Sequence, residues 1–360
     1  MRSCFFPRAG LRDGMKKIPV DRFADRGLGM IVMVVVGVLG FAGCQGMDQG
    51  ERDADGSLAG KVVCVDPGHG GTAETDHFRV GTAGEREEWI NLRVALLLRD
   101  MLEERGARVV MTRTEDVSVE LKDRALLAVE NNADVFVSIH HNATADPEVN
   151  FPIVYFHGAA SENSAGVALG RLLARNIRDA LFDGDTPACL ISDRAIFPEK
   201  GANVLRNSYG IPGVIGEASF FSNADEEQRL KTAEANRVEA QAYLVTLEEF
   251  FAAEIPPIAE VGARVDLPPF AVLEGGERME EEALAWRRLF LRGSELMKSG
   301  DQESLEEALD LFTRSARAFP DSSVAQQCHR YRVALLALLG REVEAKVEAR
   351  RAEEYYVGVE

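Results

Sequence analysis

The feature that most constrains this fold is an alternation of short β-rich runs with longer helical runs between Lys61 and Phe251. Runs rich in β-branched residues predict strands at 62–66, 108–112, 135–139, 153–156 and 213–217. The segments between them predict helices at 91–105, 121–130, 164–181 and 233–251. Strands that alternate with helices form layered α/β structures with a largely buried sheet. We therefore predict an α/β fold for this part of the chain.

Two of these helices carry signals at their ends. Gly106 follows the helix at 91–105, where a glycine commonly ends a helix because it adopts a left-handed backbone conformation. Ser161 or Ser164 is the expected N-cap of the helix at 164–181, because a serine hydroxyl accepts a hydrogen bond from a free backbone N–H.

The chain changes character after residue 253. Two Pro-Pro pairs bracket a stretch without periodicity, which predicts a Pro-rich linker at 254–277. Helices are expected beyond it at 277–292, 304–319, 323–339 and 341–354. Ala308, Leu311, Phe312, Ala316 and Pro320, with Gly293 before them, resemble one tetratricopeptide repeat. We expect residues 278–360 to form a small all-α tetratricopeptide-like region, and a plain helical hairpin is the alternative.

The first residues have the order of a secretory signal. Basic residues extend to Arg26, an apolar run covers 28–42, and Gly43-Cys44 follows. The apolar run is shorter than the roughly 20 residues that span a membrane. The sequence Phe41-Ala42-Gly43-Cys44 resembles a lipoprotein signal with Phe in place of the usual Leu, and an uncleaved anchor is the alternative.

We accordingly expect a lipoprotein-type signal peptide at 1–43, with Met15 as an alternative start, and a polar tether at 44–58. The resemblance implies export, with a membrane anchor through a lipid on Cys44. Gln45 favours the outer membrane, facing the periplasm, if the source is Gram-negative.

Charge and cysteine usage exclude two classes of function. The formal net charge is −18, residues 1–43 contribute +4, and the remainder therefore carries −22. A body this acidic repels phosphate backbones, so we expect no nucleic-acid partner. The five cysteines include no CxxC pair, which excludes a thiolate zinc site. Cys64 lies in an apolar run that predicts a strand, so we interpret it as a small buried apolar side chain. A Cys64–Cys189 disulfide is the alternative.

Three polar residues stand where predicted strands end or a helix begins. His69 lies in a DPGHGG turn, Glu87 precedes the helix at 91–105, and His140 follows the strand at 135–139. Ligands in α/β folds usually bind at the carboxyl edge of the sheet. If the three ends converge, two imidazoles and one carboxylate form a zinc site with an open fourth position. Ordinary cleft or surface histidines are the alternative.

Glu217 ends the apolar strand predicted at 213–217. A carboxylate beside a metal-bound water could act as a general base and then protonate a leaving nitrogen. The alternative is a residue that caps the following turn or pairs with an arginine.

These segments resemble the zinc-dependent N-acetylmuramoyl-L-alanine amidases of bacterial cell walls. The matches, in the family's order, are VVCVDPGHGG at 62–71, EEWINL at 87–92, TRTED at 112–116 with Leu121 and Arg124, SIHHNA at 138–143, and EASFFSN at 217–223. The sequence departs from the family pattern in four ways. The interval between His69 and Glu87 is longer and contains a charged loop at 74–79, and Glu85 and Glu88 next to Glu87 are alternative ligands. Val129 stands where the family often has Asn, and Ser219 replaces its usual Gly.

The resemblance implies a catalytic domain at 59–253 with a mixed, largely parallel twisted sheet flanked by helices. It implies one Zn²⁺ per chain held by His69, Glu87 and His140, with Glu217 as the catalytic residue. The implied reaction cleaves the amide between N-acetylmuramic acid and L-alanine in peptidoglycan. The alternatives are a non-catalytic peptidoglycan-binding lipoprotein scaffold and, more distantly, a zinc peptidase. The C-terminal helices are candidates for binding a protein partner.

Overall fold

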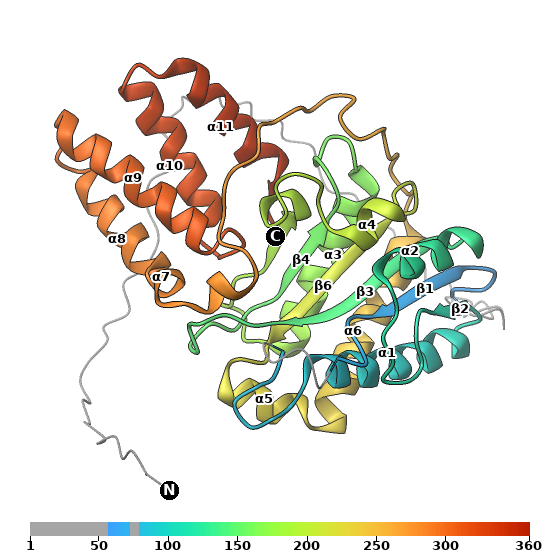
Figure 1. Ribbon diagram of the computed structural model, residues 1–360. Helices are drawn as coiled ribbons and strands as arrows, with labels where there is room; N and C mark the ends of the chain where they lie inside the picture. Colours follow the sequence, from blue (N-terminus) through green and yellow to red (C-terminus); the bar gives the residue numbers. More distant parts are fainter. Residues whose placement is uncertain (1–56, 73–78) are drawn as a thin grey trace, which may run out of the picture. The chain divides into compact units, whose positions relative to one another are not determined.

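The computed structural model describes residues 57–72 and 79–360. The predicted signal peptide, Cys44, nearly all of the tether and most of the charged loop at 74–79 lie outside the described residues. No helix in the described part of the chain is long and apolar enough to cross a membrane. Figure 1 shows a central sheet with helices around it and a helical region at the C-terminal end.

The sheet has seven strands in the order β2-β1-β3-β6-β4-β5-β7. The strands are β1 (Val62–Pro67), β2 (Arg108–Met111), β3 (Val135–Asn142), β4 (Ile153–Phe156), β5 (Cys189–Ser192), β6 (Gly213–Phe220) and β7 (Tyr356–Val357). The β4–β6 and β5–β7 pairs are antiparallel, and the other four pairs are parallel. The predicted mixed, largely parallel sheet is thus confirmed, but β5 and β7 were not predicted.

The helices of the α/β part are α1 (Glu87–Glu104), α2 (Leu121–Glu130), α3 (Ser164–Leu181), α4 (Asn203–Asn207), α5 (Ala224–Leu230) and α6 (Ala233–Ala252), with the 3-10 turn η1 (Asp193–Ala195). Gly106 follows α1 with φ 86°, as the sequence predicted. The serine N-cap prediction for α3 is wrong, because the Asn163 side chain accepts the hydrogen bond from Gly166 N. Asparagine competes with serine for this position on equal terms.

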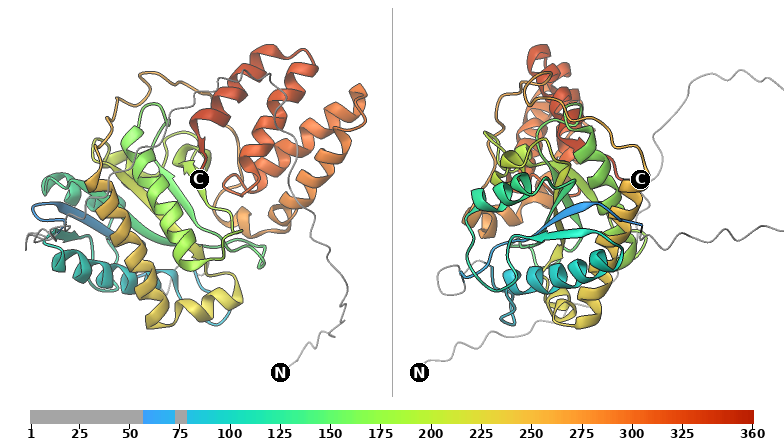
Figure 2. Two further views of the ribbon diagram at one scale, coloured as in Figure 1. Left: turned by 180° about the vertical axis from the view of Figure 1, so that it is seen from behind. Right: turned by 90° about the vertical axis from the view of Figure 1, so that its right-hand side faces the viewer.

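Both faces of the sheet are covered, which explains why its strands are apolar throughout. On β1, Val63 and Val65 belong to one core cluster, whereas Cys64 belongs to the other. Helices α1, α3 and α6 build the first cluster, and Figure 2 shows α3 and α6 lying across that face. The second cluster draws on α2, α4 and the C-terminal helical region.

The C-terminal region consists of the 3-10 turn η2 (Gly275–Met279) and helices α7 (Glu281–Leu284), α8 (Trp286–Leu296), α9 (Gln302–Ala318), α10 (Ala325–Leu338) and α11 (Glu342–Glu354). Helices α8 to α11 pack in succession, and Gly293 lies against the Phe312 ring. Phe319, at the end of α9, contacts Phe151 and Phe220 of the sheet core. β7 then pairs with β5. The helical region is therefore joined to the sheet by core packing as well as by the chain.

The predicted linker is irregular but held in place. Glu162, at the start of α3, accepts hydrogen bonds from the backbone N–H groups of Gly262, Arg264 and Val265. Near its end, Leu273 N donates to Arg317 O at 2.9 Å. Because its backbone groups are hydrogen-bonded, this segment is not a flexible spacer. We call its part before η2, residues 254–274, the strap.

The cysteines of the described chain are free thiols, so the alternative of a Cys64–Cys189 disulfide is not realised. Burial raises the pKa of both thiols to about 12. Each therefore serves as a small apolar side chain in the sheet.

Candidate metal centre and cleft

The turn after β1 presents His69 at the carboxyl edge of the sheet. His69 has φ 58°, a left-handed conformation that costs a non-glycine residue energy and is concentrated at functional sites. The preceding Gly68 has no room for a side chain, because a Cβ there would lie 2.2 Å from the His140 ring. The turn sequence thus brings the two histidines into contact.

Two buried arginines hold this turn. Arg124 Nη1 pairs with Asp66 Oδ1 at 2.9 Å, and Arg124 Nη2 donates to His69 O at 2.5 Å. Arg113 Nη2 donates to Gly68 O at 2.8 Å. Asp66 also accepts from Ser138 Oγ on β3 at 2.6 Å, which ties the turn to the neighbouring strand. Arg113 of the TRTED segment and Arg124 therefore hold the turn that carries His69 in place.

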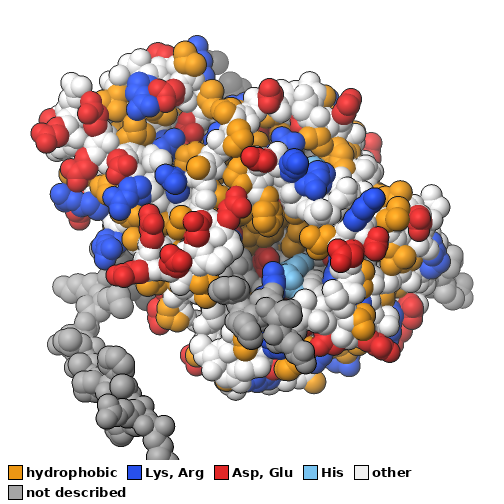
Figure 3. Space-filling view, viewed as in Figure 1, with side chains coloured by type: hydrophobic (Ala, Val, Ile, Leu, Met, Phe, Trp, Pro, Cys, Tyr) orange, Lys and Arg blue, Asp and Glu red, His pale blue; other side chains and the backbone are white. Residues whose placement is uncertain are grey.

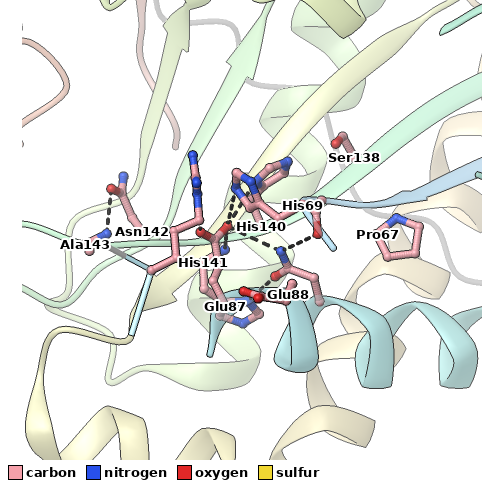
Figure 4. Close-up of polar contacts among 12 residues, drawn as sticks. Pro67, His69, Glu87, Glu88, Ser138, His140, His141, Asn142 and Ala143 are labelled. Carbon is pink, nitrogen blue, oxygen red and sulfur yellow. Dashed lines mark hydrogen bonds and ion pairs between the residues drawn. The ribbon is translucent and has the colours of Figure 1, made fainter. Parts of the chain in front are cut away.

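His69, Glu87 and His140 converge as the sequence predicted. Glu87 Oε1 lies 3.1 Å from His69 Nε2 and 2.9 Å from His140 Nδ1. One donor atom from each of the three residues lies within 4.8 Å of the other two. Figure 4 shows the three side chains pointing toward one another from the β1 turn, the start of α1 and β3. Two imidazole nitrogens and a carboxylate oxygen are a donor set suited to zinc.

The contacts of the neighbouring Glu85 and Glu88 distinguish Glu87 as the carboxylate that faces the two histidines. Glu85 pairs with Arg93 at 2.8 Å, and the fully buried Glu88 pairs with Arg86 at 2.6 Å. Both carboxylates are thus engaged away from the histidines. Glu87 is the first residue of α1, rather than a residue ahead of the helix.

The electrostatics of the cluster favour a charged Glu87. Burial opposes its ionisation, but the two adjacent histidines hold the pKa of Glu87 well below its usual range. Burial lowers the pKa of His69, which favours the neutral imidazole that a metal requires. Burial acts in the same direction on His140, but there the hydrogen bond to Glu87 outweighs it and raises the pKa.

Three buried side chains, joined by hydrogen bonds, support Glu87: Asn91, His141 and Glu239. Asn91 Nδ2, one helical turn after Glu87, lies 3.3 Å from Glu87 Oε1 and from Gly68 O. Asn91 Oδ1 is 2.9 Å from His141 Nδ1, and His141 Nε2 is 3.0 Å from Glu239 Oε2 on α6. The pairing register of β3 with β6 shifts between His140 and Asn142. Such an irregularity lets adjacent residues serve different sites.

Glu217 lies directly beside the cluster. It is paired in register with His140 on the neighbouring parallel strand, so the two side chains share a sheet face. Glu217 Oε2 is buried and has no hydrogen-bond partner among the residues that the structure describes, which leaves it free to take a proton. Burial raises the pKa of Glu217 to about 7; nearby His140 opposes this rise, and Glu87 adds to it.

The cluster opens into a cavity of about 660 Å³. Figure 3 shows histidine side chains at the floor of a hollow and hydrophobic side chains along its wall. The apolar wall includes Tyr155, Phe197, Leu273 and Met279. Leu273 and Met279 come from the strap and from η2, so the C-terminal part of the chain contributes directly to this cleft.

Arg278 fixes that C-terminal wall. Its Nη2 atom lies 2.6 Å from Asp321 Oδ1, and the other carboxylate oxygen of the fully buried Asp321 accepts a hydrogen bond from Tyr155 on β4. Asp321, Arg278 and Glu239 were missed in the sequence, because each lies far along the chain from the partners that give it a role. The local sequence does not distinguish them, since Arg278 stands among other charged residues and Asp321 in a turn-like Pro-Asp-Ser-Ser stretch.

Comparison with known proteins agrees with the motif order. The family model described as N-acetylmuramoyl-L-alanine amidase matches residues 63–249, which is more than half of the chain. AmiC of Escherichia coli O6:H1 is 29% identical over 227 residues, which cover 53% of each chain. AmiA of Escherichia coli K12 is 30% identical over 207 residues, or 48% of this chain and 70% of AmiA. This chain therefore matches about half the length of the first of these relatives.

Solved structures with a similar arrangement include AmiC2 of Nostoc punctiforme. It is 27% identical, has a TM-score of 0.46, and the match covers 55% of this chain and 99% of AmiC2. The catalytic domain of CwlV from Bacillus (Paenibacillus) polymyxa is 28% identical with a TM-score of 0.45, covering 54% of this chain and 99% of that domain.

Proposed function

The chain belongs to the N-acetylmuramoyl-L-alanine amidase family, and from this premise we propose that it hydrolyses the amide between N-acetylmuramic acid and L-alanine in peptidoglycan. The observation that carries the proposal is the position of Glu217, which lies in register with His140 beside the three-residue cluster and whose Oε2 atom has no hydrogen-bond partner within the described part of the chain. An acid–base group next to a metal-binding cluster is the arrangement that amide hydrolysis requires.

We further propose that His69, Glu87 and His140 hold one Zn²⁺ per chain. Their donor atoms lie close enough to share one ion, and the three residues leave a position for water or substrate. When bound, zinc polarises a carbonyl oxygen and lowers the pKa of its water toward about 7. Asn91 and the backbone N–H of His141 hold the Glu87 carboxylate in place.

Glu217 is proposed to move the proton. Its pKa of about 7 suits a group that must both accept and release a proton near neutral pH. Glu217 Oε2 takes a proton from the attacking water as the new C–O bond forms. The same proton then goes to the amide nitrogen as the C–N bond breaks, which frees the muramic acid carboxyl group and the L-alanine amine.

The decisive experiment uses the purified chain loaded with zinc and isolated cell-wall sacculi. The expected products are peptide-free glycan strands and stem peptides with a new N-terminal L-alanine, identified by mass spectrometry. Glu217→Gln should lower turnover by at least about 100-fold and keep the zinc content unchanged. A Glu249→Gln variant, altered at an exposed site on α6, controls for the change of charge.

Two outcomes would contradict the proposal. Full activity of Glu217→Gln would remove Glu217 from the mechanism. Binding of the wild-type chain to sacculi without any new N-terminus would favour a non-catalytic scaffold instead.

We also propose that the protein is exported and anchored by a lipid on Cys44. The support is the order of basic residues, apolar run and Gly43-Cys44 in the sequence. Mass spectrometry of the membrane-associated protein should find an acylated N-terminal cysteine, and Cys44→Ser should release the protein into the soluble fraction. An unmodified cysteine in the wild-type chain would refute the anchor.

A further inference from the structure

A second groove adjoins the cavity beside His69, Glu87 and His140. The groove has a volume of about 560 Å³ and shares Phe197 and Glu274 with the catalytic cavity. Its other lining residues include Pro198, Lys200 and Pro269. A ligand longer than one subsite could therefore extend from the metal cluster across Phe197 and Glu274 into the groove.

Both walls of the groove are held in place. The first wall is the loop that follows η1, and it is pinned by the fully buried Asp193, which accepts from Ala202 N at 2.8 Å and lies 2.7 Å from His157 Nδ1. The second wall is the strap before η2, fixed by the bond from Leu273 N to Arg317 O. Binding to preformed walls avoids the entropic cost of ordering them.

Phe197 is unusual in its exposure. Its side chain is 46% exposed, although it stands between two cavities and follows a buried turn. An aromatic ring attracts weakly positive C–H groups to its face, and the C–H faces of pyranose rings offer such groups. The carboxylates of Glu199 and Glu274 and the ammonium of Lys200, all exposed on the groove, can bond to hydroxyl and acetamido groups.

Charge distinguishes between the two parts of a peptidoglycan ligand. Among the described residues that line the groove, Glu199 and Glu274 are acidic and Lys200 is the one basic residue. Such a site disfavours stem peptides, which carry free carboxylates. The glycan strand has no charge where its muramoyl carboxyl groups are bound in amides. The uncharged glycan is thus the better match.

We propose that the groove is a subsite for the glycan strand of peptidoglycan, with Phe197 as the platform on which a sugar ring packs. The proposal rests on the amidase activity proposed above, and it assigns the strap and the η1 loop a role in substrate choice. The protein should therefore act on muramoyl groups within a strand in preference to a single disaccharide-peptide.

The test compares KM for two substrates, long peptide-bearing glycan strands and a single disaccharide-peptide, in the full zinc-loaded chain. Phe197→Ala should raise KM for the strands about 10-fold more than it raises KM for the fragment. Phe197→Trp should restore the wild-type KM. Leu338→Ala removes a side chain that is 67% exposed on α10, away from both cavities, and should change neither constant.

A binding experiment separates this inference from the proposed activity. Calorimetry with peptide-free glycan strands whose muramoyl carboxyl groups are capped as methylamides, and which therefore carry no charge, should show binding to the wild-type chain and about 10-fold weaker binding to Phe197→Ala, whether or not the chain hydrolyses sacculi. Equal KM changes for strands and fragment, or no change at all, would overturn the subsite. Competition by free stem peptides but not by glycan strands would overturn it as well.

Discussion

His141 Nε2 on β3 lies 3.0 Å from Glu239 Oε2 on α6, next to the cluster of His69, Glu87 and His140. Both side chains are buried, and 98 residues of sequence separate them. On its other side His141 contacts Asn91, which in turn contacts Glu87. Helix α6 thus supports the position of Glu87, a residue of the candidate metal site, through His141 and Asn91.

Removal of Glu239 should therefore weaken zinc binding. Glu239→Ala leaves His141 free to rotate and loosens Asn91, so zinc affinity should fall by about 10- to 100-fold, as is typical for residues that orient metal ligands. Glu239→Gln, which retains an acceptor, should recover most of this loss. Glu248→Ala on the same helix should have no effect, because Glu248 lies with Arg105 at the surface.

Competition with a chromogenic chelator measures these affinities, and circular dichroism confirms that each variant is folded. An unchanged zinc affinity in folded Glu239→Ala would show that Glu239 has no positioning role.

The turn at Gly68 should tolerate no side chain. In Gly68→Ala the new Cβ would lie 2.2 Å from the His140 ring, so His140 must move out of the cluster. We expect loss of stoichiometric zinc binding with the fold preserved. Gly184→Ala is the matched control, because a Cβ at Gly184 would meet nothing within 4 Å. Zinc content by atomic emission is the readout, and one zinc per chain in Gly68→Ala would contradict the expectation.

The helical region should be needed for the stability of the whole described body. Phe319 packs against Phe151 and Phe220 of the sheet core and against Trp286 of α8. Phe319→Ala should lower the free energy of unfolding by about 3–5 kcal/mol. Leu291→Ala, at a 57% exposed position on α8, should change it by less than about 0.5 kcal/mol.

Urea unfolding followed by circular dichroism tests this prediction, with cleavage of the unfolded chain by a protease as a second readout. If Phe319→Ala unfolded only the C-terminal helices and left the sheet at its original midpoint, the shared core would be refuted.

Acid should weaken one buried pair in the helical region. The Glu348 carboxylate lies 2.7 Å from His329 Nδ1, and His329 with Arg332 holds the pKa of Glu348 at about 2, below its ordinary 4.5, although burial opposes this. The unfolded chain therefore binds this proton first, and the stabilisation is lost as pH falls from about 4.5 toward 2. Burial lowers the pKa of His329, so its protonation below about 6.5 acts in the same direction.

The lowered pKa of Glu348 corresponds to about 3 kcal/mol at neutral pH. The difference in unfolding free energy between wild type and Glu348→Gln should shrink by about this amount between pH 6 and pH 2.5. Glu353→Gln, exposed on α11, should follow the wild type. Urea titrations at several pH values provide the comparison, and a difference that stays constant with pH would rule out this linkage.

The hydrophobic periodicity of the sequence determined the strands and helices that carry the candidate metal site. Five strands and the four principal helices of the α/β part follow from hydrophobic periodicity, because a sheet buried on both faces requires continuous apolar runs. The order of DPGHGG, Glu87, SIHHNA and Glu217 also follows from the sequence alone. Parallel strands present their carboxyl ends at one edge, so residues at those ends meet.

Only the tertiary structure decided what surrounds that site. β7 has two residues, too few to stand out in periodicity, and it exists because the C-terminal segment returns to pair with a strand far earlier in the chain. The contacts of Glu239 with His141, and of Asp321 with Arg278 and Tyr155, join residues distant in sequence. A buried charge is stable only with a partner, and folding alone determines which residue that partner is.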